Sequence, residues 1–241
     1  MADSSFMVSP FSVTLETDDE YIGSLLRRES CFLHPKLDSS SMESARPDVV
    51  RWIMKMKAFF GLCSRTAYVA LSYFDHFTHR TIDLTKGKRW KIQLLSVACL
   101  SLAVKMEERQ GLSLTEFQTE NYWFDGKAVQ RMELLVLSTL EWRMSRVTPF
   151  SYLNHCSSKA MEWKAIELIF ENIEAMNLVA YRASSIAAAS ILAAQDNERL
   201  TQKSLKSKMS SVSWMRSLNS DEVFSCYIMM IQESQEKKLH A

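Results

Sequence analysis

Few residues of the 241-residue chain are spaced for catalysis or metal binding. His76 and His79 lie three positions apart beside Asp75, a spacing that could bring ligands toward one metal ion. Successive helical residues point in different directions, however, and no fourth ligand is near, so we interpret both histidines as exposed helix residues. The adjacent His155 and Cys156 would diverge for the same reason and form no nucleophile pair.

Motifs that cradle phosphates, position a nucleophile or hold zinc are also missing. The chain has 5 glycines and contains neither Gly-x-Gly-x-x-Gly, Gly-x-x-x-x-Gly-Lys nor Gly-x-Ser-x-Gly. Its 5 cysteines are scattered without a Cys-x-x-Cys pair, which argues against a zinc ribbon and a disulfide framework. We therefore expect no enzyme activity, no cofactor and no bound metal.

Two charged residues interrupt apolar helix patterns. Lys105 follows the almost wholly apolar run 94–104, and Glu133 lies within the apolar register of residues 129–137. A charge on a packed helix face is costly unless it is paired or reaches solvent. Either Lys105 extends into water at its helix end and Glu133 lies at the edge of its stripe, or both line a surface for a partner.

The composition favours a helical protein that binds neither membranes nor nucleic acid. Hydrophobic residues make up 47% and charged residues 24%, and 5 glycines with 4 prolines are few chain breakers. A net charge of +1, from 29 basic and 28 acidic residues, is small for a duplex-binding domain. The start shows no secretory signal, and the longest apolar run is about half a membrane span. We expect an all-α, intracellular protein.

Helical periodicity divides the chain into two similar halves. Capping and stop signals predict a helix from residue 18 to about 30, followed by helices that begin near Arg46, Ser64, Gly87, Ser113 and Gly126, the last ending near Trp142. Thr148 and Pro149 then predict an N-cap and a first helical residue that start the second half. Residues 184–194 repeat the small and apolar pattern of residues 96–104.

A helix that is small or apolar on every side must be surrounded by other helices. The repeat therefore predicts two five-helix bundles, each built around one such helix, with a short N-terminal helix in front. The expected boundaries are a mobile tail over 1–17, a first unit with its preceding helix over 18–147, a second unit over 148–235 and a tail over 236–241.

Several ordered motifs resemble those of the cyclin box. Residues 94–108, which end in Ala-Val-Lys-Met-Glu-Glu, closely resemble its third helix, and Tyr-Phe-Asp-His-Phe at 73–77 is similar to a segment of its second. Residues 46–53 are similar to its first helix, residues 131–137 to its fifth, and Val-Thr-Pro-Phe at 147–150 to the start of a second box. Lys-Met-Glu-Glu with Thr-Pro-Phe is most similar to plant D-type cyclins. The resemblance implies a tandem cyclin-box fold.

The resemblance also implies a binding surface for a cyclin-dependent protein kinase. The five signature positions of the family fall on Arg46, Asp75, Leu94, Lys105 and Glu133. In the family, the positions of Arg46 and Asp75 hold a buried ion pair between the first two helices. Those of Lys105 and Glu133 hydrogen-bond the backbone at the end of the kinase αC helix. Neighbouring kinase contacts fall on Leu102, Met106, Glu108, Leu137 and Trp142.

The sequence departs from the family at a second surface. The groove where many cyclins dock Arg-x-Leu substrate motifs falls on Val49, Trp52 and Gln93, beside Ala45 and Asp48. Asp48 stands where an apolar residue is usual, which argues against docking of that motif. None of the 5 cysteines lies in Leu-x-Cys-x-Glu, so retinoblastoma binding by that route is not predicted.

The function implied by the resemblance is regulation of a kinase. The expected protein binds and activates a cyclin-dependent serine/threonine kinase, positions its αC helix and activation loop, and promotes G1 progression and cell division. Kinase inhibitors are further candidate partners, and a location in the nucleus and cytoplasm is expected. The basic run at 86–91 is either an import signal or phosphate contact, or the solvated start of a helix. The alternative hypothesis is a cyclin-fold adaptor in transcription that acts without activating a kinase.

Overall fold

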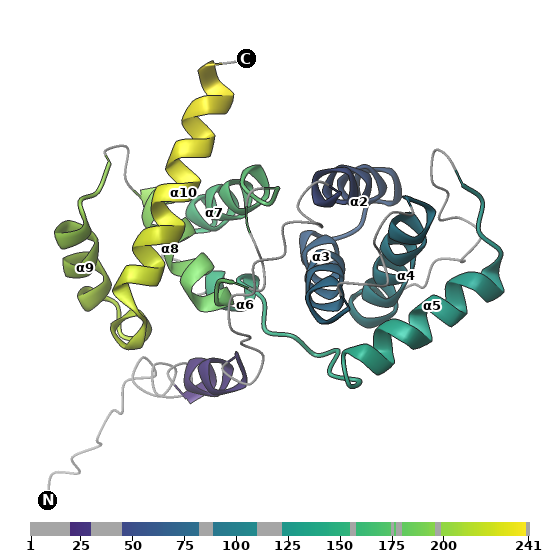
Figure 1. Cartoon of the computed structure of the whole chain (residues 1–241). Helices are drawn as coiled ribbons and strands as arrows, with labels where there is room; N and C mark the ends of the chain where they lie inside the picture. Colours follow the sequence, from purple (N-terminus) through teal and green to yellow (C-terminus); the bar gives the residue numbers. More distant parts are fainter. Residues whose placement is uncertain are drawn as a thin grey trace, which may run out of the picture.

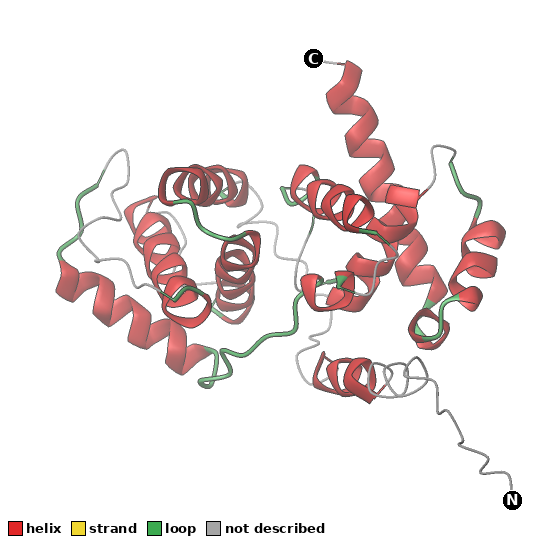
Figure 2. Ribbon diagram, turned by 180° about the vertical axis from the view of Figure 1, so that it is seen from behind, coloured by secondary structure: helices red, strands yellow, loops and turns green. Residues whose placement is uncertain are grey.

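The protein consists of two helical bundles. The computed structural model describes residues 20–29, 45–81, 89–109, 122–154, 158–174, 176, 180–195 and 199–239. Over these ranges every regular element is a helix, and no strand occurs (Figures 1 and 2). Helices α2 to α5 lie on one side and α6 to α10 on the other, joined by the segment between α5 and α6 (Figure 1). The expected all-α fold is confirmed.

The first bundle is built around α4. Its described helices are α2 (Arg46–Phe60), α3 (Ser64–Arg80), α4 (Arg89–Glu107) and α5 (Gly126–Thr139). Residues 94–104 of α4 are buried without interruption, and α3 and α5 pack against this helix. Its alanines and serines let the neighbouring helices approach closely, while leucine and valine fill the core. The helix predicted from Ser113 lies outside the described residues.

Local chemistry sets the ends of α2 and α3. Gly61 follows α2 in the left-handed conformation, with φ 64°, and its amide donates to the carbonyl of Lys57. Glycine adopts this conformation without the steric cost that a Cβ brings. The sequence predicted Ser64 as the cap of α3, and this prediction is wrong. Cys63 is the cap, because its Sγ accepts a hydrogen bond from the Thr66 amide at 3.4 Å.

The second bundle repeats the plan around α8. Its described helices are α6 (Phe150–Leu153), α7 (Lys159–Glu171), α8 (Ala183–Gln195), α9 (Gln202–Ser211), the 3-10 helix η2 (Trp214–Ser217) and α10 (Ser220–Leu239). Residues 183–194 are all buried, and α7 and α10 pack against α8. The central helix of each half is thus surrounded, as its composition predicts. Helix α10 continues past the predicted boundary at residue 235.

The start of α6 differs from the prediction. Pro149 is the N-cap of α6, and no side chain caps this helix. The hydroxyl of Thr148 is buried and has no hydrogen-bond partner among the described residues. The prediction of a Thr148 cap is therefore wrong.

The helical residues 20–29 lie on the second bundle. Figure 1 shows them below α6, and the carboxylate of Glu29 accepts a hydrogen bond from the Ser184 amide at 2.7 Å. Arg28 donates to the carbonyl of Ser145 at 3.3 Å in the segment that joins the bundles. The sequence groups this helix with the first unit, whereas its hydrogen bonds join it to the second. The tail predicted over 1–17 lies outside the described residues.

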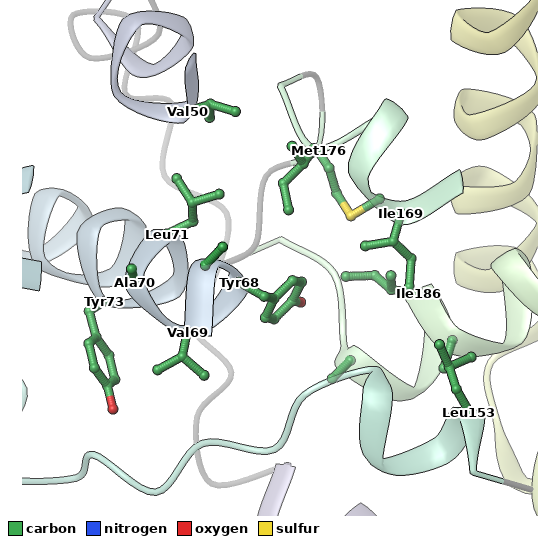
Figure 3. Packing of buried hydrophobic residues seen from close by; sticks show 14 of the residues in the cluster. Val50, Tyr68, Val69, Ala70, Leu71, Tyr73, Leu153, Ile169, Met176 and Ile186 are labelled. Carbon is green, nitrogen blue, oxygen red and sulfur yellow. The ribbon is translucent and has the colours of Figure 1, made fainter. Parts of the chain in front are cut away.

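A continuous apolar core joins the bundles. Tyr68 of α3 points toward Ile169 and Ile186 of the second bundle (Figure 3). Its ring meets that of Phe150 edge to face, with centroids 5.5 Å apart, and Phe150 stacks on Phe170 at 6.1 Å. Such aromatic pairs stabilise a contact beyond the area that they bury. The two bundles therefore pack as one body through this seam of Tyr68, Phe150 and Phe170.

Candidate functional site

The two charges that interrupt the apolar patterns form one ion pair. The Lys105 Nζ at the end of α4 donates to both carboxylate oxygens of Glu133 on α5, each at 2.7 Å. The side chain of Glu133 is 7% exposed and that of Lys105 is 46% exposed. Lys105 therefore extends into water as expected, whereas Glu133 does not lie at an exposed edge, and the partner surface at these two residues stays a prediction. Glu133 is buried and paired, while Lys105 reaches water at its helix end.

Apolar side chains that are open to solvent lie on the same two helices and on the turn that follows α5. Met106 is 51% exposed, Leu134 is 57% exposed and Trp142 is 66% exposed. Leu137 is half-buried and lies one helical turn from both Glu133 and Leu134. Leu134 was not among the predicted site residues, because the heptad pattern of α5 alone does not show which apolar positions the core leaves uncovered. A charge pair among exposed apolar side chains is typical of a protein interface.

Two of the predicted contact residues have structural roles. Leu102 is 6% exposed and belongs to the core, so it supports the surface from below. The Oε1 of Glu108 accepts hydrogen bonds from the Cys63 amide at 2.9 Å and from the Thr66 hydroxyl at 2.6 Å. Partial burial opposes ionisation of this carboxyl, but the bonds from Thr66 and Cys63 outweigh it and lower the pKa of Glu108. Glu108 therefore holds Cys63, the cap residue of α3, together with Thr66 in the first turn.

Trp142 follows α5 on a left-handed turn. Helix α5 ends at Thr139, earlier than the predicted end near Trp142, because Glu141 and Trp142 adopt φ angles of 54° and 60°. The Trp142 amide donates to the Leu137 carbonyl at 2.9 Å. Arg80 at the end of α3 donates to the carbonyl of Thr139 at 2.7 Å and to the Glu141 carboxylate at 3.0 Å. The turn that carries the exposed indole is thus tied to α3.

The ion pair expected between Arg46 and Asp75 is present and extends further. The guanidinium of Arg46 binds both oxygens of Asp75, at 2.9 Å and 3.0 Å, and both side chains are largely buried. Its remaining nitrogen donates to the carbonyls of Ile173 and Glu174 in the second bundle, at 2.8 Å and 2.6 Å. Sequence reasoning missed this second role. No local periodic signal marks a contact between residues so far apart in the chain.

The groove predicted on α2 presents charge. Val49 is buried at 3% exposure and Trp52 is half-buried. Asp48 pairs with Arg51 at 3.1 Å on the surface, with side chains 74% and 70% exposed. Gln93 is half-buried, and its Oε1 has no hydrogen-bond partner among the described residues. This face offers an exposed ion pair where an Arg-x-Leu motif would need an apolar floor.

The candidate catalytic and metal residues form no site in the described part of the chain. His76 is 5% exposed and its Nδ1 lies 2.8 Å from the Ser72 carbonyl, so the prediction of an exposed His76 is wrong. His79 is half-buried. Across the described ranges no group of three metal-ligating side chains comes together, and no helix is long and apolar enough to cross a membrane. His155 and Cys156 lie outside the described residues.

Each bundle is built around one surrounded helix, and a lysine–glutamate pair joins α4 to α5. These features define an all-helical, tandem-bundle protein. The family model described as "Cyclin, N-terminal domain" matches residues 19–145. This match covers more than half of the chain, so the chain belongs to the cyclin family.

Curated relatives are plant D-type cyclins. The chain is 39% identical to Cyclin-D5-2 of Oryza sativa subsp. japonica, over 78% of this chain and 57% of that protein. It is 32% identical to Cyclin-D5-1 of Arabidopsis thaliana, over 95% of this chain and 76% of that protein. It is 39% identical to Cyclin-D1-1 of Arabidopsis thaliana, over 78% of this chain and 58% of that protein. The chain thus spans between about half and three quarters of the length of these relatives.

A solved structure shares the fold. A viral cyclin from herpesvirus saimiri matches with a TM-score of 0.65 and 16% identity, over 90% of this chain and 97% of that chain. At this identity the match shows the fold alone. The resemblance to the cyclin family, to its plant D-type members and to a tandem cyclin-box fold is confirmed.

Proposed function

We propose that this chain is a regulatory subunit that binds and activates a cyclin-dependent serine/threonine protein kinase. Binding would hold the kinase αC helix inward and move its activation loop away from the cleft, which favours the active population of the kinase. The chain itself would carry out no chemistry. We further propose that this activity promotes G1 progression and division, and that it is exercised in the nucleus and cytoplasm.

The single observation that carries the proposal is the Lys105–Glu133 pair on a cyclin fold. An ammonium group has three N–H donors, and the carboxylate oxygens of Glu133 occupy two of them. The half-exposed Lys105 can therefore donate its third N–H to a backbone carbonyl of a partner. The Glu133 oxygens keep lone pairs that can accept a backbone N–H. One pair can thus satisfy a donor and an acceptor at a helix end, while Met106, Leu134 and Trp142 supply apolar contact.

The proposal is tested by binding and by phosphate transfer. Purified chain is mixed with a cyclin-dependent kinase, captured, and assayed on a histone or retinoblastoma substrate. Removing one partner of an interfacial charge pair costs about 2–5 kcal/mol, so Lys105→Ala and Glu133→Gln should each raise Kd on the order of 30-fold or more. Kinase activation should fall in parallel, while the far-UV circular dichroism spectrum stays that of the parent chain.

A matched control comes from the second bundle. Lys159 and Glu162 on α7 also pair at 2.7 Å, and the lysine is exposed. Lys159→Ala should therefore leave kinase binding within about twofold of the parent, because an exposed pair contributes little. If the Lys105→Ala chain still activates the kinase fully, the assignment of the kinase-binding surface to α4 and α5 is wrong. A chain that binds no cyclin-dependent kinase would favour the alternative of a cyclin-fold adaptor in transcription.

A further inference from the structure

The turn that carries Trp142 has an unusual backbone. Glu141 and Trp142 are consecutive residues with φ of 54° and 60°, and among the described residues no other side-chain-bearing position has a positive φ. A residue with a Cβ rarely adopts this left-handed conformation, because the Cβ approaches the following carbonyl oxygen. Two in succession persist only where surrounding contacts hold them, and such positions cluster at functional sites.

The contacts that hold this turn come from α3 and from α5. The Glu141 amide donates to Ser138 at 3.1 Å and the Trp142 amide to Leu137 at 2.9 Å, which satisfies carbonyls at the end of α5. Arg80 then spans the turn, since its Nη1 donates both to the last carbonyl of α5 at Thr139 and to the Glu141 carboxylate. The side chain of Arg80 is 25% exposed, so these bonds are partly shielded from water.

The conformation held in this way has a clear consequence for the indole. If α5 continued through Glu141 and Trp142, the helical period alone would set the direction of the indole around the helix axis. The left-handed turn instead ends the helix and leaves the Trp142 side chain 66% exposed just after α5. A tryptophan exposed to this extent leaves most of its apolar surface in water, and a partner that covers it would gain a large rigid anchor.

We infer that Arg80 and Glu141 are positioning residues that fix the left-handed turn and thereby hold Trp142 as the outer anchor of the partner interface. This inference rests on the proposed kinase interface and adds residues that touch no partner themselves. Arg80 acts through the α5 carbonyl and the Glu141 carboxylate, and Trp142 makes the contact.

A double-mutant cycle on the full chain tests the inference. Kd for the kinase is measured for the parent, Arg80→Ala, Trp142→Ala and the double variant. We expect Trp142→Ala to raise Kd about tenfold or more, as truncation of a tryptophan anchor in an interface does. Arg80→Ala should raise Kd about fivefold in the parent and by less than about twofold in the Trp142→Ala background, since residues that act through one another are not additive.

Two further variants separate positioning from general stability. Glu141→Ala should reproduce the Arg80→Ala effect, and it decides the test if Arg80→Ala does not fold. Arg143→Ala is the matched control, because the Arg143 side chain also pairs with Glu141, at 3.3 Å, while its bond to the Leu140 carbonyl comes from the backbone amide, which the substitution keeps. In the uncomplexed chain, the Trp142 indole N–H signal should shift and its heteronuclear NOE should fall in Arg80→Ala and Glu141→Ala, and stay unchanged in Arg143→Ala.

The outcomes are distinguishable from failure of the proposed function. If Trp142→Ala binds normally while Lys105→Ala does not, the kinase interface stands and the anchor role is overturned. If the Arg80→Ala and Trp142→Ala effects simply multiply, Arg80 acts elsewhere and the positioning role is overturned. If Lys105→Ala also binds normally, the proposed interface and this inference both fall.

Discussion

At the scale of single residues, Arg46 and Asp75 show how position decides the value of a charge pair. The side chains of Arg46 and Asp75, which share two hydrogen bonds, are largely buried. The Asp48–Arg51 pair on the helix of Arg46 is open to water. Asp75→Asn leaves the Arg46 guanidinium buried without its counterion, so we expect a loss of about 3–5 kcal/mol in the free energy of unfolding. Urea unfolding followed by circular dichroism measures this loss.

The surface pair supplies the comparison for that measurement. Asp48→Asn changes the same residue type against the same partner type, at 74% exposure, and should alter the free energy of unfolding by less than about 1 kcal/mol. Equal effects of Asp75→Asn and Asp48→Asn would show that burial does not govern the Arg46 pair. If the Asp75→Asn chain is too unstable to purify and the Asp48→Asn chain purifies normally, the result still agrees with the expectation.

At the scale of elements, α3 begins on a carboxylate supplied by the end of α4. Because hydrogen bonds lower the pKa of Glu108 in the folded chain, its stabilising effect is complete above the unfolded pKa of about 4.3. The effect is lost as pH falls through the lower, folded pKa. We expect Glu108→Gln to cost about 1 kcal/mol at pH 7, as loss of a cap does, and the difference from the parent to shrink below pH ~4.

The difference between the parent and Glu108→Gln removes the contributions of other carboxyls that titrate in the same pH range. Among these is Glu107, where burial raises the pKa against the attraction of Arg65. Urea midpoints for parent and Glu108→Gln, measured between pH ~3 and ~7, give the difference directly. A difference that grows on acidification would mean that the Glu108 carboxylate does not stabilise the start of α3.

The elements also show what the sequence can and cannot specify. The run 94–104 predicts a surrounded helix because small and apolar residues on every side leave no face for water, and α4 is buried over this whole run. The Lys105–Glu133 pair was likewise marked by two charges that broke an apolar pattern. The cap of α3 was missed because a thiol replaces the usual hydroxyl, and the cap of α6 was missed because no side chain caps that helix. Bonds from Arg46 to the second bundle leave no periodic trace.

At the scale of the whole molecule, the Tyr68–Phe150–Phe170 seam should make the two bundles unfold together. Phe150 lies between α3 and α7, in edge-to-face contact with Tyr68 and stacked on Phe170. Phe150→Ala removes both contacts and leaves a cavity between the bundles, which should cost about 3 kcal/mol and weaken their coupling. Calorimetry of the parent should show one transition, with the calorimetric and van't Hoff enthalpies equal. Phe150→Ala should lower the Tm and separate the transition into two.

The control for the seam is an aromatic residue of the same type outside it. Phe59 is 77% exposed and meets Phe60 edge to face at 4.9 Å on α2, so Phe59→Ala should change the free energy of unfolding by less than about 1 kcal/mol. If Phe150→Ala lowers the Tm but keeps one transition with equal enthalpies, coupling lies instead in the hydrogen bonds from Arg46 to Ile173 and Glu174. Those bonds join the same two bundles, so an Arg46→Lys, Phe150→Ala double variant would then separate the transitions that the single change leaves together.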